Sequence, residues 1–157
     1  MFELGLETLK KKVISLFVVA SDMGFLGTRA IWLSDLNLLL QIAILAILII
    51  GINFAKKKNF VVHGRILTLA VILNAILILF IMIPSLIGGF GFFLTELYSV
   101  GALIILGHAI LGSITEVLGA ILIFRKFGNV KRWMRIEASL WFISIFLGFS
   151  FYIYYYV

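Results

Sequence analysis

Four ionisable side chains lie in stretches that are otherwise apolar: His63, His108, Glu116 and Glu137. Charged and titratable groups are rare inside membrane helices, and those present tend to mark a binding or transport site. An imidazole can ligate haem iron or a metal ion, or relay a proton. Two carboxylates and a histidine can together hold a divalent cation. These four residues are therefore the first candidates for function.

His63, Glu116 and Glu137 are the candidate metal ligands. Helix arithmetic places His63 about 5 Å and Glu116 about 12 Å from the same end of the bundle, and Glu137 about one turn from it. The three side chains are thus expected to meet near one membrane face. The alternative is that the two carboxylates neutralise Arg65 and Arg135, which lie at the same end.

His108 and His63 are the candidate cofactor ligands, with haem b as the cofactor considered. Their predicted depths differ by roughly 20 Å at about 1.5 Å per helical residue. Two axial ligands of one haem lie at nearly the same level, so a bis-histidine haem is not favoured. Asn74 lies near the predicted level of His108, and we expect these two to hydrogen-bond between helices. The alternative is that His108 is a single haem or metal ligand, or a proton relay.

The intramembrane polar residues Asn74, His108 and Glu116 are expected to face other helices. On a helical wheel, one side of the stretch from Ser99 to Phe124 carries Gly101, Ile104, Ile105, His108, Gly112, Thr115, Glu116 and Gly119. Small and polar residues line helix contacts in membranes, because they allow close approach and hydrogen bonding. No Ser-His-Asp order, zinc-binding spacing or phosphate loop occurs, so no catalytic residue is predicted and the chain is not expected to be an enzyme.

The elements that carry these residues are membrane-spanning helices. Of the 157 residues, 64% are hydrophobic and only 13% are charged, with a mean hydropathy of +1.23. A soluble domain is about 25% charged. The sequence predicts an all-α, polytopic membrane protein built as a four-helix bundle over residues 34–157. The expected spans cover about 36–54, 60–83, 99–124 and 133–155, with Ser34 as the first helix cap and Pro84 ending the second span.

Residues 1–33 are expected to form a separate N-terminal segment. Apolar residues recur at helical spacing from Met1 to Ala20, opposite a charged face, which is typical of an amphipathic helix in the membrane interface. The alternative is that Val13 to Leu33 forms a fifth span. That span would place Asp22 and Arg29 inside the bilayer, at about 2.5–3.5 kcal/mol each.

The basic residues predict the orientation of the bundle. The net charge is +6, and nine of the 13 lysines and arginines flank the first and third connections between spans. Positive charge collects on the cytoplasmic side, so both basic loops are expected there and the C-terminus outside. The expected location is the cell membrane. The partners are then the lipid bilayer and other membrane subunits, whereas the basic charge gives no reason to invoke nucleic acid.

The chain resembles a family of small four-helix membrane proteins linked to cytochrome c oxidase assembly and respiratory haem–copper biology. The resemblance rests on GFLGTRA at Gly24–Ala30, VVHGR around His63, LGHA around His108, and Gly148 before a tyrosine-rich end. It implies four spans, with GFLGTRA outside the first core helix. The family tends to have a histidine at the start of the fourth span. This chain reads Asn129-Val130-Lys131-Arg132 there, so one ligand of a joint histidine site would be missing.

The resemblance implies a non-catalytic accessory or assembly protein of a terminal oxidase. The small size and the sparse polar residues motivate a second hypothesis, a structural subunit of a larger membrane complex. The third hypothesis is a haem b electron carrier. Loss of oxidase assembly on deletion, stable partners in mild detergent, and a red purified protein would support the three hypotheses in turn.

Overall fold

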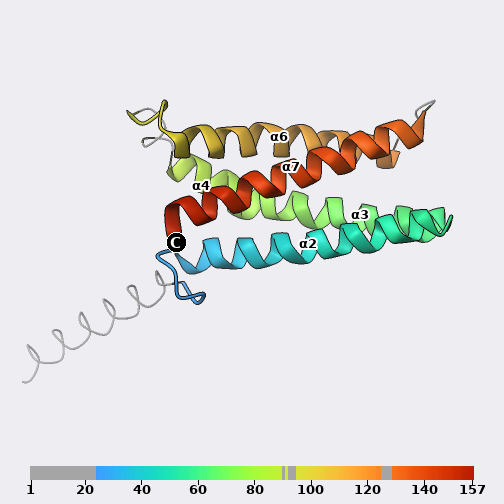
Figure 1. The fold of residues 1–157 in the computed structure, drawn as a ribbon, viewed down its shortest axis with the longest axis horizontal. Coiled ribbons are helices and arrows are strands. Elements are labelled where there is room, and N and C mark those ends of the chain that lie inside the picture. Colours follow the sequence, from blue (N-terminus) through green and yellow to red (C-terminus); the bar gives the residue numbers. More distant parts are fainter. Residues whose placement is uncertain (1–23, 90, 92–94, 125–128) are drawn as a thin grey trace, which may run out of the picture.

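The computed structural model describes residues 24–89, 91, 95–124 and 129–157, and these form an all-helical bundle (Figure 1). The helices are α2 (Trp32–Lys56), α3 (Phe60–Leu77), the π-helix η1 (Ile78–Met82), α4 (Ile83–Gly88), α6 (Val100–Phe124) and α7 (Val130–Tyr156). Four continuous helical stretches are long and apolar enough to cross a membrane within this part of the chain: α2, α3 through α4, α6 and α7. The predicted fold class is therefore confirmed.

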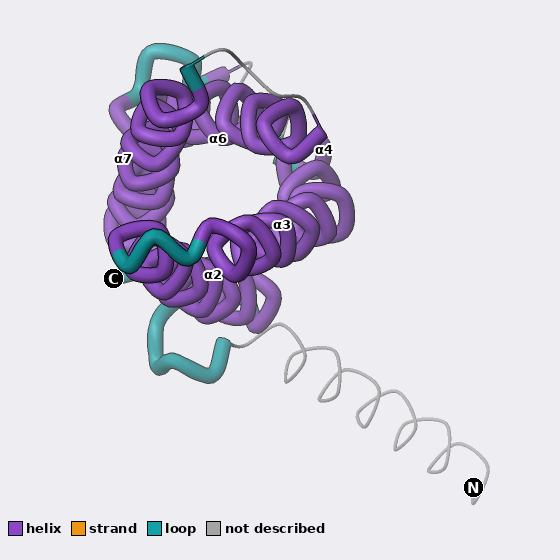
Figure 2. Tube along the Cα trace, turned by 90° about the vertical axis from the view of Figure 1, so that its right-hand side faces the viewer, coloured by secondary structure: helices purple, strands orange, loops and turns teal. Residues whose placement is uncertain are grey.

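The helices associate as two close pairs. α2 packs mainly on α3, and α6 mainly on α7, while contacts between the pairs are fewer. Seen from the end, α7, α6, α3 and α2 follow one another around a ring (Figure 2). The buried core joins both pairs and consists of Ile44, Leu48, Ala70, Leu77, Ile81, Trp141 and Ile145. Many large apolar side chains remain exposed along the outside of the bundle, as expected for surfaces that face lipid.

Three helix boundaries differ from those predicted. α2 begins at Trp32 with Ile31 as its cap, so Ser34, the predicted cap, lies inside the helix. The second span does not end at Pro84 but continues to Gly88, and a π turn precedes the proline. A proline in a helix removes one backbone donor and crowds the preceding turn, and the wider π turn relieves that crowding. α7 begins at Val130, capped by the Asn129 side chain.

A buried polar cluster ties the start of α2 to the end of α7. Asp35 is fully buried and accepts hydrogen bonds from the Tyr152 hydroxyl and, at 2.8 Å, from the Leu26 amide. Thr28 Oγ1 lies 2.8 Å from the Tyr152 hydroxyl. The Arg29 amide donates to the Tyr156 carbonyl at 3.0 Å. The GFLGTRA segment is thereby folded back as a non-helical turn against the C-terminal end of the bundle.

That turn bears on the N-terminal predictions. Residues 24–31 carry no helix, so no continuous helix runs from Val13 to Leu33 as the alternative of a fifth span requires. The rest of that stretch, and the amphipathic helix predicted for Met1–Ala20, lie outside the described residues.

Candidate functional site

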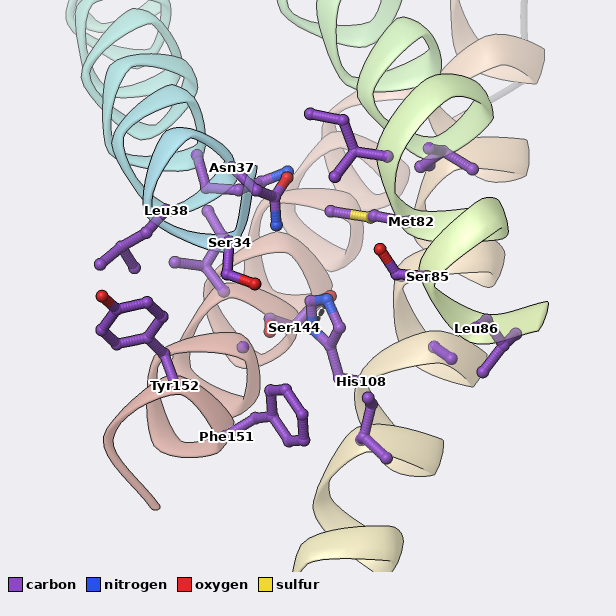
Figure 3. Close-up of a pocket in the computed structure, with 18 of the residues that line it drawn as sticks. Ser34, Asn37, Leu38, Met82, Ser85, Leu86, His108, Ser144, Phe151 and Tyr152 are labelled. Atoms are coloured by element: carbon purple, nitrogen blue, oxygen red, sulfur yellow. Dashed lines mark hydrogen bonds between the residues drawn. The ribbon is translucent and has the colours of Figure 1, made fainter. Parts of the chain in front are cut away.

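One cavity lies between the two helix pairs, and we call it the His108 cavity (Figure 3). Its volume is about 420 Å³, which is in the range of small-molecule sites. All the described helices contribute to its wall. Its polar lining residues are Ser34, Asn37, Gln41, Asn74, Ser85, His108, Ser113, Thr115, Ser144, Tyr152, Tyr155 and Tyr156. The remaining lining is apolar, so the cavity suits a ligand that is soluble in the membrane.

His108 is held in one orientation against α7. Its Nδ1 lies 2.8 Å from the Ser144 carbonyl oxygen. Because a carbonyl only accepts, we assign the hydrogen to Nδ1, which makes Nε2 an acceptor that has no hydrogen-bond partner among the described residues. The ring also packs on Gly148, where an added Cβ would lie 3.0 Å from His108 Cε1. The prediction that His108 packs against another helix is confirmed, and its ring extends into the cavity in Figure 3.

A second acceptor in this region belongs to Asn37. Its Oδ1 is buried and has no hydrogen-bond partner among the described residues. Asn37 lines the same cavity from α2. The free polar atoms of His108 and Asn37 are thus both acceptors, and a ligand that donates hydrogen bonds would satisfy them.

Asn74 does not pair with His108, so that prediction is wrong. Its amide accepts from Gln41 Nε2 at 3.0 Å and donates to Glu116 Oε2 at 2.8 Å. These bonds link α2, α3 and α6 across the interior. Depth arithmetic gave only the level of Asn74 along its span, and it carried no information on which polar neighbour lies on the facing side. The prediction that Glu116 faces the bundle is confirmed.

The smaller cavity contains His63 and Glu137, and we call it the Glu137 cavity. Its volume is about 200 Å³, and its other lining residues are mostly apolar or aromatic. His63 Nδ1 lies 2.8 Å from the Gly51 carbonyl oxygen, so Nε2 of this imidazole is also an acceptor, and no described residue donates to it. Glu137 Oε1 accepts from Trp141 Nε1 at 2.8 Å. Trp141 lines both cavities and lies between them.

The predicted metal site is not assembled as a set of three. His63 and Glu137 line the same cavity, but Glu116 does not line it and instead accepts a hydrogen bond from Asn74. Nowhere in the described part of the chain do three histidine, aspartate or glutamate side chains lie close enough to hold a metal ion. Within the described residues, Glu137 hydrogen-bonds with Trp141 and Glu116 with Asn74, so the alternative pairing with Arg65 and Arg135 gains no support either.

The two candidate haem ligands line different cavities, His63 with Glu137 and His108 with Ser144. One chain therefore does not offer both imidazoles to a single haem. His108 is the one histidine that lines the His108 cavity, so it is the one imidazole there that could ligate a haem iron. The residues of this cavity do not fit a bis-histidine haem.

Sequence reasoning missed Trp141, Ser144 and Asp35. Glu137, Trp141, Ser144, Gly148 and Tyr152 follow one another at spacings of three or four, so they share one face of α7. That face could have been found by the wheel that located His108. Asp35 gave no such signal, because an acid in a first helical turn is common.

Comparisons with protein-family models, curated proteins and solved structures give no match for this chain. The resemblance to an oxidase-assembly family therefore stays a prediction.

Proposed function

We propose that this protein is a non-catalytic integral membrane protein that binds one membrane-soluble ligand in the His108 cavity. The supporting observation is the fixed imidazole: His108 donates through Nδ1 to Ser144, lines a cavity of about 420 Å³, and has no partner for Nε2 among the described residues. Ligating histidines are commonly oriented in this way by a backbone carbonyl. A merely structural histidine between helices would be expected to use both nitrogens.

The ligand class follows from the lining. Most of the wall is apolar, and the free polar atoms of His108 and Asn37 are acceptors. The cavity is suited to an apolar molecule with hydroxyl or N–H groups, or to a haem with His108 as its one protein ligand. Bound haem would supply one-electron redox chemistry. His108 would fix the position of either ligand, and the apolar helices would exclude water from it.

We place this binding function within a respiratory assembly, where the protein acts as an accessory or assembly factor of a terminal oxidase. The support is the resemblance of the GFLGTRA, VVHGR and LGHA segments. Its lipid-facing helices would contact other membrane subunits, and both basic connections would lie in the cytoplasm with the C-terminus outside. A structural subunit without a ligand is the competing function.

Purification in mild detergent separates these functions. The wild-type protein should carry a ligand that organic extraction and mass spectrometry can identify, and a Soret absorption band would identify it as haem. Deletion of the gene should lower the amount of assembled terminal oxidase. A protein that is free of ligand, together with normal oxidase in the deletion strain, would contradict the proposal.

A further inference from the structure

Glu137 is a buried carboxylate with one oxygen left unsatisfied. Its side chain is 7% exposed, and its Oε2 has no hydrogen-bond partner among the described residues. Burial of an ionisable group is costly unless the group is paired. Because Glu137 lines a cavity, an occupant of that cavity can supply the missing partner.

The fold fixes the position of this carboxylate. Oε1 is held by the indole N–H of Trp141 one turn along α7. On the facing helix, a Cβ added at Gly119 would lie 2.9 Å from the same oxygen, so α6 approaches closely only because glycine is there. The carboxylate is thus oriented by a hydrogen bond within α7 and packed against the backbone of α6 at Gly119.

The other features of the cavity define what the occupant must offer. His63 also presents a free acceptor, because its Nδ1 donates to Gly51. Trp141 and Phe142 contribute aromatic side chains, and most of the remaining wall is aliphatic. None of the described lysines and arginines lines the cavity. An occupant therefore needs N–H donors, preferably with positive charge, and an apolar body.

We propose that the Glu137 cavity binds the protonated amino group of an amphipathic amine, with Glu137 as its counter-ion. An ammonium group has three donors and no acceptor, which matches the two free acceptors. Aromatic rings stabilise such a cation further. A divalent metal ion is a poorer match, since within the described residues no third histidine or carboxylate joins His63 and Glu137. This site is separate from the His108 cavity and does not depend on the function proposed there.

The volume limits the size of the amine. A cavity of about 150 Å³ is enough for benzene, and this one measures about 200 Å³. A benzylammonium ion is therefore a suitable probe. Lys56, Lys57, Lys58 and Arg65 are exposed at the same end of the bundle and would repel cations in water. Salt at about 0.15 M screens that repulsion beyond about 8 Å.

The test is fluorine NMR of 4-fluorobenzylammonium with the detergent-solubilised full chain at that salt concentration. Wild type should show saturable binding. Glu137→Gln keeps the shape and removes the charge, and it should weaken binding at least tenfold. Glu96→Gln, at an exposed carboxylate before α6, is the matched control and should bind as wild type does.

A neutral analogue tests the charge without any substitution. The wild-type protein should bind 4-fluorobenzyl alcohol at least tenfold more weakly than the ammonium compound. Equal affinity for both compounds, equal affinity of wild type and Glu137→Gln, or partitioning into micelles without saturation would each overturn the proposal. The comparison of the two compounds decides the question even where Glu137→Gln fails to fold.

Discussion

Replacing Asn74 by leucine is the most informative test of the polar interior. Asn74 is 8% exposed and links Gln41 to Glu116 through hydrogen bonds of 3.0 and 2.8 Å. Leucine has a similar size but no polar atoms. The substitution therefore removes both bonds and leaves an amide and a carboxyl group without their partner inside the bundle.

The magnitude follows from the two lost bonds. Hydrogen bonds between membrane helices contribute about 0.6 kcal/mol on average and at most about 1.7 kcal/mol, because the unfolded chain in the membrane also finds partners. Two bonds give about 1–3 kcal/mol. The upper half of that range is expected, because one of the groups left unpaired is a carboxyl group.

The assay is reversible unfolding in mixed micelles, read as the free energy of unfolding. Asn53→Leu serves as the control, because Asn53 is exposed near the end of α2. We expect Asn74→Leu to be less stable than the control by about 1–3 kcal/mol. Equal stability of the two variants would show that the Gln41–Asn74–Glu116 chain does not hold the helices together.

Three further tests concern other parts of the structure. Gly101→Ala should destabilise the bundle by about 1–3 kcal/mol through overpacking, because the added Cβ would collide with a tyrosine ring on α7. The control is Gly107→Ala, where the nearest neighbour of the added Cβ would lie 3.7 Å away. This control should be nearly neutral in the same unfolding assay. Tyr152→Phe removes a donor to the fully buried Asp35 and should speed hydrogen exchange in the segment that precedes α2; unchanged exchange would contradict that tie. The chain has no cysteine, so a single cysteine at Asn59 should resist labelling from outside intact cells and one between α4 and α6 should react; the reverse pattern would invert the predicted orientation.

Periodicity and hydropathy predict much of this fold. The four spans, the inward position of Glu116 and the packing of His108 on another helix all follow from apolar length and a 3.6-residue wheel. They follow because the cost of a polar group in lipid leaves few alternatives. The ends of the helices were less predictable, as the π turn before Pro84 shows, because local backbone geometry decides them.

The hydrogen-bond partners of the polar side chains could not be predicted from the sequence. Asn74 was expected to pair with His108, but it bonds Gln41 and Glu116 instead. Depth along a helix can be calculated from residue number, whereas rotation and the choice of neighbouring helix depend on packing. The fully buried Asp35 shows the same limit, since its hydrogen-bond donors are a loop amide and a tyrosine 117 residues away.

The most direct test of the central claim compares the ligand content of three purified proteins. Wild type, His108→Ala and His63→Ala are purified in the same mild detergent, and the extracted ligand is quantified per protein chain. Because His108 lines the larger cavity and His63 the smaller one, wild type and His63→Ala should carry about one ligand per chain. His108→Ala should carry at least tenfold less. Equal ligand content in all three proteins, or loss only in His63→Ala, would contradict the claim that His108 holds the ligand.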